Sequence, residues 1–400
     1  MAALLTYGYL IQGLYVTMLA IQSALVPWLI GANSFGLGVY LLSIAVISEG
    51  LLEPVWQLSI TNRPRGLAVS EVSVIRDSAI VCLLAACAGF WLASEHVSPA
   101  LALLVALYTV TFYASVVAQS YLYRLQRIRE IALSMCGGVA AYCIPLAFLD
   151  GPAMLVAANL CFTSATLIGN LIGLRGSGIV PDRAGGASPP AKVRFYLSCL
   201  ATRAPFVVLN NGLTFVLGAQ GLFRDVAIFR LVASAIYAGR FLSPVSPGVF
   251  SSMIEAHRLG RGRHPLVVLS WKLMLWIVYG IALVFLLPFV VHAIYPGMVL
   301  GAERYVALVA PAYLMMQLLF YWFMLRGRAR NRDFAAIVIS LCSLLAAGAL
   351  YVLWGVWIAF AGGCLITTAA IVAVIVYGER FLGSEPEAAD RQAGSQPADP

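Results

Sequence analysis

Five charged side chains lie inside long apolar runs of this chain, and their chemistry has to be explained first. Two are acids, Glu49 and Glu53, and three are arginines, Arg203, Arg230 and Arg240. A guanidinium group matches phosphate oxygens with parallel hydrogen bonds, whereas a carboxylate can hold a cation or pair with an arginine. Five unpaired charges inside a bilayer would together cost on the order of 10 kcal/mol. We therefore expect them to share a hydrated cavity or to pair with one another.

Other polar residues accompany these charges at helical spacing. Side chains three or four positions apart lie on the same face of a helix. Three polar stripes result, formed by Glu49, Glu53 and Gln57, by Arg203, Asn210 and Asn211, and by Arg230, Ser234, Tyr237 and Arg240. In each apolar run, the charged side chains thus have polar neighbours on the same helical face.

Apolar helices carry these stripes. The residues AVILMFWYC make up 62% of the chain and DEKR only 10%, too little charge to cover the surface of a soluble protein. About 20 apolar residues cross the hydrocarbon core of a membrane. We predict an all-α polytopic membrane protein of about twelve transmembrane helices, at about 5–30, 36–60, 73–94, 98–123, 130–149, 152–174, 193–217, 226–253, 266–291, 305–325, 334–354 and 355–378. The first span lacks a basic leader, so we expect it to be retained.

Basic residues alternate between the loops. Arginine clusters such as Arg124, Arg127 and Arg129 follow the even-numbered spans, whereas the other loops offer only Arg224 and Arg304. The positive-inside rule then places both termini in the cytoplasm. We expect the protein to be a multi-pass protein of a bacterial inner membrane. We predict a first lobe at 1–175, a cytoplasmic linker at 176–192, a second lobe at 193–378 and a disordered tail at 379–400.

The two predicted lobes resemble each other weakly. Leu29-Ile30-Gly31-Ala32 corresponds to Val216-Leu217-Gly218-Ala219, and Glu53-Pro54-Val55 corresponds to Ser243-Pro244-Val245, at offsets of 187 and 190 residues. Six spans separate equivalent helices, so both copies have the same membrane orientation. Parallel repeats of this kind are typical of alternating-access transporters with a midplane cavity between the lobes.

At these positions the sequence resembles a known family, the polysaccharide flippases of the multidrug, oligosaccharidyl-lipid and polysaccharide exporter superfamily. The resemblance lies in Leu29-Ile30-Gly31, Phe35-Gly36, Val39-Tyr40 and Glu49-Gly50, and in the second-lobe run from Leu217-Gly218 to Val226-Ala227-Ile228-Phe229. One departure is clear, because Pro27-Trp28 stand where the family usually has an arginine.

The resemblance implies a two-lobed exporter with a central cavity. Its substrate would be a polyprenyl-pyrophosphate-linked oligosaccharide, moved from the cytoplasmic to the outer leaflet for cell-surface polysaccharide biosynthesis. Expected partners are this lipid-linked oligosaccharide, the lipid bilayer, and a polysaccharide polymerase or other assembly proteins. We expect no bound cofactor and no nucleic acid.

Within this family, the arginines are candidates to bind the pyrophosphate. The repeat aligns Glu49 with Gly239, next to Arg240, so Glu49 and Glu53 would either couple to a proton or sodium ion or lock the lobes by pairing with arginine. For Arg230 we favour a structural role. Candidates to bind sugar are Gln12, Gln22, Tyr123, Gln317 and Tyr321, together with Asn210 and Asn211 as cavity amides.

We predict no metal-binding or catalytic role for the cysteines, the histidines and the charges near span ends. All eight cysteines lie in apolar spans, and neither they nor the four histidines show metal-ligand spacing. Snorkelling and local pairing account for Lys272, Arg76 and Asp77. We therefore predict neither a metal site nor a catalytic site.

Two other functions stay open. A multidrug or small-solute exporter of the same superfamily would favour an acid-rich cavity for cationic drugs, and this chain places three arginines there instead. A membrane enzyme of envelope polysaccharide biogenesis would need a long outer loop with catalytic groups or an in-membrane His–Asp pair. The predicted outer loops are short and the histidines lie apart, so we expect no enzyme.

Overall fold

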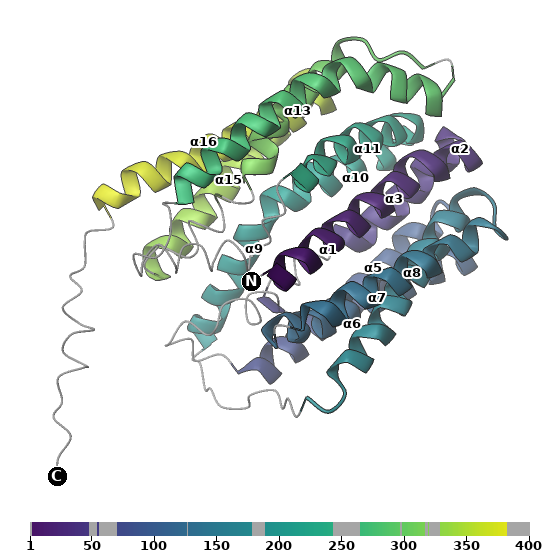
Figure 1. The fold of residues 1–400 in the computed structure, drawn as a ribbon, viewed down its shortest axis with the longest axis horizontal. Helices are drawn as coiled ribbons and strands as arrows, with labels where there is room; N and C mark the ends of the chain where they lie inside the picture. The colour runs from purple at the N-terminus through teal and green to yellow at the C-terminus, as the bar shows by residue number, and fades with distance from the viewer. Residues whose placement is uncertain are drawn as a thin grey trace.

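The computed structural model describes residues 2–47, 54–55, 70–125, 127–177, 189–242, 265–296, 298–316, 319 and 329–381. Within these ranges every regular element is a helix (Figure 1). The first half of the chain forms α1 (Ala2–Ala20), η1 (Ile21–Leu25), α2 (Val26–Ile30), α3 (Ala32–Ile47), α5 (Glu71–Ser94), α6 (Pro99–Arg124), α7 (Ile128–Leu146) and α8 (Gly151–Leu174).

The second half repeats this succession. It forms α9 (Pro189–Val207), η3 (Val208–Gly212), α10 (Leu213–Ala219), α11 (Phe223–Ala238), η4 (Gly239–Leu242), α13 (Pro265–Ile294), η5 (Ala302–Val309), a helical segment over 310–316, α15 (Ala329–Trp354) and α16 (Val356–Phe381). Here η1 and η3 are π-helices, and η4 and η5 are 3₁₀-helices.

Each of the twelve predicted spans coincides, wholly or in part, with a helix of the described residues. Eight helical stretches there are long and apolar enough to cross a membrane unaided. The other four predicted spans correspond to α3, α7, α11 and the η5 segment, where the described helix is shorter or carries charge. The predicted all-helical membrane fold is confirmed.

Local sequence signals explain where these helices begin and turn. The hydroxyl of Ser70 accepts a hydrogen bond from the backbone N–H of Ser73 at 3.1 Å and caps α5. Between α2 and α3, Gly31 adopts φ 78°, and between α15 and α16, Gly355 adopts φ 84°. Both angles lie in the left-handed region that glycine occupies without strain. Each glycine therefore makes a tight turn between two helices.

The outer surface of the bundle is apolar. Large side chains such as Phe285, Leu345 and Val352 are 67%, 73% and 82% exposed. Contiguous apolar exposure of this kind marks a surface that lies against something other than water. Together with the long apolar helices, it identifies a multi-pass membrane protein.

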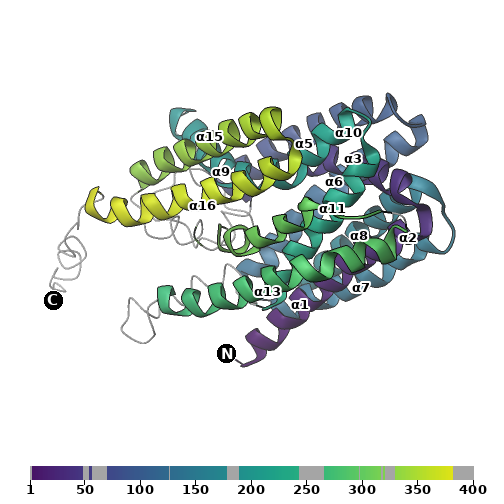
Figure 2. The same cartoon turned by 90° about the horizontal axis from the view of Figure 1, so that it is seen from above.

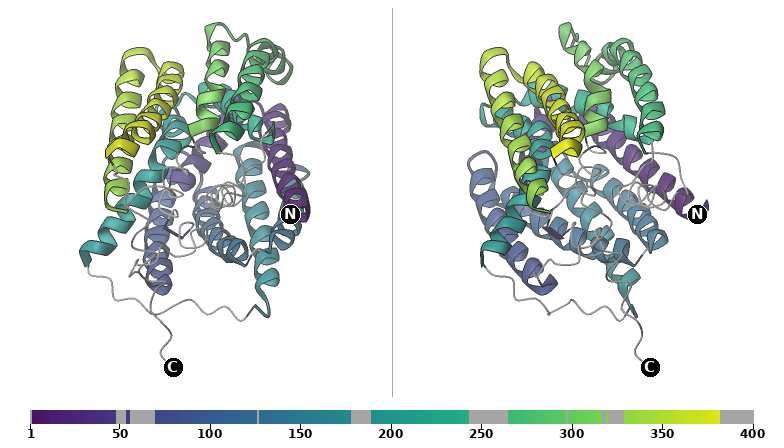
Figure 3. Two further views of the ribbon diagram at one scale, coloured as in Figure 1. Left: turned by 60° about the vertical axis from the view of Figure 1, so that its left-hand side comes forward. Right: turned by 90° about the vertical axis from the view of Figure 1, so that its left-hand side faces the viewer.

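The helices divide into two lobes. In the first lobe α8 packs against α6 and α7, and α5 packs against α6. In the second lobe α16 packs against α15, and α15 packs against α9 (Figure 2). In both views of Figure 3 the green and yellow helices α13, α15 and α16 lie above the blue helices α5 to α8.

We name the two ends of the bundle by their residues. The glycine-turn end carries the turns at Gly31, Gly151, Gly221 and Gly355. The arginine-rich end carries the junctions between α6 and α7 and between α8 and α9, with Arg127 among their residues.

The lobes contact each other closely toward the glycine-turn end, where α3 packs against α10 and α11. A β-carbon on Gly218 of α10 would overlap the ring of Tyr40 on α3. The same ring stacks on Phe215, with 5.6 Å between centroids, and lies 6.1 Å from Phe223. Because Tyr40 is 2% exposed, this aromatic contact excludes water and joins the lobes at this end.

Candidate substrate cavity between the lobes

A cavity of about 230 Å³ lies where the two lobes meet. Helices of both lobes line it, and most of its wall is apolar or aromatic. The polar lining residues are Tyr15, Gln22, Ser43, Tyr108, Asn159 and Thr163 from the first lobe, and Arg203, Asn210, Asn211, Arg230, Ser234, Tyr237 and Tyr313 from the second. Convergent polar groups among apolar and aromatic side chains are typical of a ligand site.

The α11 helix contributes a polar stripe to the cavity. Arg230, Ser234 and Tyr237 are spaced by four and three residues, so they lie on one helical face, and all three line the cavity. The Nε atom of Arg230 and the hydroxyl of Ser234 are buried, and neither has a hydrogen-bond partner among the described residues. Buried polar groups in native proteins are nearly always bonded to protein, water or a ligand, so these two donors are available to a molecule that enters the cavity. Both can donate a hydrogen bond to an anion.

A second guanidinium group, that of Arg203 on α9, also lines the cavity. Among the described lining residues there are thus two positive charges and no carboxylate. Low-dielectric walls focus the field of such charges into a cleft. The described part of the cavity is therefore suited to an anionic group.

Two π-helices border the cavity at equivalent positions of the two lobes. The first, η1, spans 21–25 and the second, η3, spans 208–212, an offset of 187 residues. This is the offset that the predicted repeat has at Gly31 and Gly218. A π-turn adds a residue to the helical turn and is often found at functional sites. Gln22 comes from η1, and Asn210 and Asn211 come from η3, so both π-helices supply cavity amides.

Hydrogen bonds hold the η3 amides in place. The Asn210 amide donates from Nδ2 to the Tyr313 hydroxyl at 2.8 Å, and its Oδ1 accepts from that hydroxyl at 3.0 Å. The Thr214 hydroxyl donates to the backbone carbonyl of Asn210 at 2.7 Å. Asn210 is thereby fixed from both its side chain and its backbone, which gives the cavity wall a defined polar group.

The structure brings five of the predicted site residues together in the cavity wall, namely Arg203, Arg230, Asn210, Asn211 and Gln22. We favoured a structural role for Arg230, yet the structure places it in the lining with an unbonded Nε. Outside the described residues lie Glu49, Glu53, Gln317, Tyr321 and the side chain of Arg240.

Two predicted sugar-binding candidates lie away from the cavity lining. Gln12 is in helical register with Tyr15 and Leu19, which line the cavity, but lies a turn beyond them toward the start of α1. Tyr123 packs with a separate apolar cluster around Leu122. The described cavity lining does not extend along α1 as far as Gln12.

Sequence reasoning missed several lining residues, among them Asn159, Thr163 and Tyr313. Asn159 lies within the predicted span at 152–174, and its amide donates to the backbone carbonyl of Leu155 at 2.9 Å. An amide inside an apolar span is costly without a partner, and this was the available signal. Nothing in the sequence distinguishes Tyr313 from the other tyrosines of the predicted spans.

No protein-family model matches this sequence, and no curated protein matches it significantly. Solved structures do match. An inward-facing multidrug resistance transporter of the MATE family, in the MOP superfamily, gives a TM-score of 0.54 at 15% identity and covers 98% of this chain and 96% of its own. The outward-facing conformation of such a transporter gives a TM-score of 0.52 at 13% identity. That match covers 98% of this chain and 93% of the transporter chain.

The lipid II flippase MurJ, in an inward closed conformation, is similar to the same degree. Its TM-score is 0.56 at 13% identity, and the match covers 93% of this chain and 86% of that chain. This chain has the fold of these transporters. At such identities the similarity concerns the fold alone, so the substrate has to be argued from the cavity.

Proposed function

We propose that this protein is a flippase that moves a polyprenyl-pyrophosphate-linked oligosaccharide from the cytoplasmic to the outer leaflet of a bacterial inner membrane. It works by alternating access and serves cell-surface polysaccharide biosynthesis. In this proposal the protein carries out no chemical conversion, and both termini face the cytoplasm. Its partners are the lipid-linked oligosaccharide, the bilayer, and a polymerase or other assembly proteins.

The observation that carries this proposal is the pair of unbonded donors in the cavity wall. The Nε atom of Arg230 and the hydroxyl of Ser234 lie one turn apart on α11, and Arg203 lines the same cavity. A pyrophosphate presents several charged oxygens, and charge-assisted hydrogen bonds to them are about twice as strong as neutral ones. Binding would satisfy the two buried donors, Arg230 Nε and the Ser234 hydroxyl.

The size of the cavity fits a head group better than a whole substrate. At about 230 Å³ it is smaller than the roughly 300–1,000 Å³ of pockets that enclose drug-sized ligands. A lipid-linked oligosaccharide would leave its polyprenyl chain in the bilayer, against the apolar outer surface, and present its pyrophosphate to the arginines. Coupling of the transport step to a proton or sodium ion is proposed for Glu49 and Glu53.

A multidrug or small-solute exporter is the alternative function. The fold similarity fits both functions, because the similar structures include multidrug transporters as well as a lipid II flippase. What favours the flippase is the unbonded Nε–H of Arg230 in the cavity wall, because a guanidinium group can only donate hydrogen bonds and therefore suits an anionic substrate.

The test is deletion of the gene in its native host. We expect surface polysaccharide to be lost and its lipid-linked precursor to accumulate on the cytoplasmic leaflet. Complementation with the wild-type gene should restore export, and complementation with Arg230→Gln should not. Unchanged surface glycan together with altered drug susceptibility would reject the flippase in favour of the multidrug exporter.

A further inference from the structure

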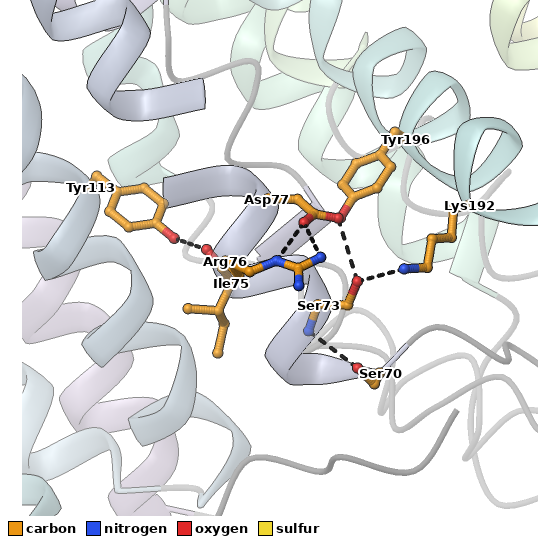
Figure 4. Close-up of polar contacts among 8 residues, drawn as sticks. All are labelled: Ser70, Ser73, Ile75, Arg76, Asp77, Tyr113, Lys192 and Tyr196. Atoms are coloured by element: carbon orange, nitrogen blue, oxygen red, sulfur yellow. Dashed lines mark hydrogen bonds and ion pairs between the residues drawn. The ribbon is translucent and has the colours of Figure 1, made fainter. Parts of the chain in front are cut away.

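The two lobes also meet at the arginine-rich end, through a polar contact between α5 and α9 (Figure 4). The Lys192 ammonium group on α9 donates to the Ser73 hydroxyl on α5 at 2.8 Å. The Tyr196 hydroxyl on α9 donates to Asp77 Oδ2 on α5 at 3.2 Å. Lys192 and Tyr196 are four residues apart, as are Ser73 and Asp77, so one turn of each helix faces one turn of the other.

The acceptors on α5 are held in position by their own lobe. The Ser73 hydroxyl lies 3.4 Å from Asp77 Oδ2, and Arg76 donates to Asp77 Oδ1 at 2.9 Å. On the neighbouring α6, the Tyr113 hydroxyl donates to the backbone carbonyl of Ile75 at 2.7 Å. The first turns of α5 therefore move with the first lobe.

The donors on α9 belong equally clearly to the second lobe. The α9 helix packs against α15, and the Ser340 hydroxyl on α15 donates to the backbone carbonyl of Ala201 on α9. Thus Lys192 and Tyr196 are fixed to one lobe, and Ser73 and Asp77 to the other.

An apolar contact underlies these hydrogen bonds. Val74 of α5 packs in one buried cluster with Phe195 and Cys199 of α9. Val74 and Cys199 are both fully buried. The contact therefore excludes water at its base, while its polar rim stays accessible, since the side chain of Asp77 is 29% exposed.

Sequence reasoning assigned Asp77 to local pairing. The pair with Arg76 is present, with Nη2 and Oδ1 2.9 Å apart, but the second carboxylate oxygen of Asp77 bonds Tyr196 of the other lobe. These partners are 119 residues apart in the chain, so no local pattern could reveal the contact.

The structure assigns Ser73, Asp77, Lys192 and Tyr196 as an inter-lobe latch that holds this end of the bundle closed and must open during transport. We call this set the α5–α9 latch. Rocking of one lobe against the other changes the distance between elements fixed to different lobes. Two hydrogen bonds with 2.8 and 3.2 Å donor–acceptor distances survive in only one relative orientation. Partly exposed hydrogen bonds are weak enough to break and re-form in each cycle.

The chain contains its own reporter of latch opening, because Cys199 is fully buried at the base of the contact. In a variant whose other seven cysteines are replaced by alanine, separation of α5 and α9 opens the cluster that buries Cys199 and exposes its thiol to a maleimide. The labelling rate is measured on the full chain in lipid vesicles. No substrate is needed, so this test can fail independently of the proposed flippase function.

Two tyrosines give a matched comparison. Tyr196→Phe removes a hydroxyl that bonds α5 across the lobes, whereas Tyr113→Phe removes one that bonds α5 within its lobe. We expect Tyr196→Phe combined with Lys192→Gln to raise the labelling rate of Cys199 about tenfold, the shift expected for losing two hydrogen bonds. Tyr113→Phe should leave the rate unchanged.

Equal labelling of the Tyr196→Phe/Lys192→Gln protein and its parent would overturn the latch. So would an equal rise in Tyr113→Phe, because it would reflect general loosening of α5. If the double variant does not fold, Tyr196→Phe alone, which loses a single oxygen atom, is compared with Tyr113→Phe on the same criterion. Lys192→Arg, which keeps a donor at this position, should label at the parental rate.

Discussion

Gly36 of α3 and Phe223 of α11 touch through their backbones. A β-carbon on Gly36 would overlap the carbonyl group of Phe223, and it would also lie 3.0 Å from the Phe223 Cα. Small residues allow membrane helices to approach this closely, because no side chain separates the two backbones. The α3–α11 contact joins the lobes toward the glycine-turn end, so this glycine sets how closely the lobes can meet there.

We predict that Gly36→Ala forces α3 and α11 apart. The obstacle is backbone and not the end of a flexible side chain, so the structure cannot relax by a rotamer change. Overpacking of this kind costs about 1–3 kcal/mol. Thermal unfolding in detergent, monitored by size-exclusion chromatography, should show a lower midpoint temperature for Gly36→Ala than for the wild type.

The matched control is Gly137→Ala on α7. A β-carbon at Gly137 meets nothing within 4 Å, so its unfolding midpoint should equal or slightly exceed that of the wild type. A Gly36→Ala protein as stable as Gly137→Ala would contradict the close approach of α3 and α11.

Transport should require the planar guanidinium group of Arg230 and not only its positive charge. Arg230→Lys keeps a positive charge but loses the planar fork, so we expect transport to fall about tenfold, and further in Arg230→Gln. Arg224→Gln, at the exposed start of the same helix, should transport normally. Transport is measured as flipping of lipid-linked oligosaccharide in reconstituted vesicles, with protein abundance determined in parallel. Normal flipping by Arg230→Gln would remove this residue from the binding site.

The Asn210–Tyr313 pair should be energetically coupled. Tyr313→Phe removes both hydrogen bonds between the two side chains and leaves the Asn210 amide without them, at a cost of about 1–3 kcal/mol. In a protein that already carries Asn210→Ala, Tyr313→Phe should lower the free energy of unfolding by much less. Thermal unfolding of the two single variants and the double variant gives the coupling, and strict additivity would show that the pair contributes nothing.

Topology is predicted from the arginine alternation. Reporter fusions at residues 178 and 390 should both report the cytoplasm, and a fusion after Gly221 should report the outside. Alkaline phosphatase activity at residue 178 or 390 would contradict the twelve-span arrangement.

Composition and hydrophobic patterning were sufficient to predict the fold class. Apolar runs of membrane length and a repeat at an offset of 187 residues can both be recognised in the sequence. The structure has helices and paired π-helices at the corresponding positions. In a bilayer the backbone must satisfy its own hydrogen bonds, so an apolar run of sufficient length becomes a helix regardless of its neighbours.

The candidate site was only partly predictable. A charge inside an apolar span is costly, and this alone identified Arg203 and Arg230 as candidates. The spacing of Arg230, Ser234 and Tyr237 predicted that they share one helical face, and all three line the cavity. Tertiary packing decided which of these faces meet, how far the cavity extends along α1, and that Tyr313 fixes Asn210. It also decided that Asp77 bonds Tyr196 across the lobes. Contacts between residues 103 or 119 positions apart depend on the relative placement of whole helices, and the local sequence around either partner contains no record of that placement.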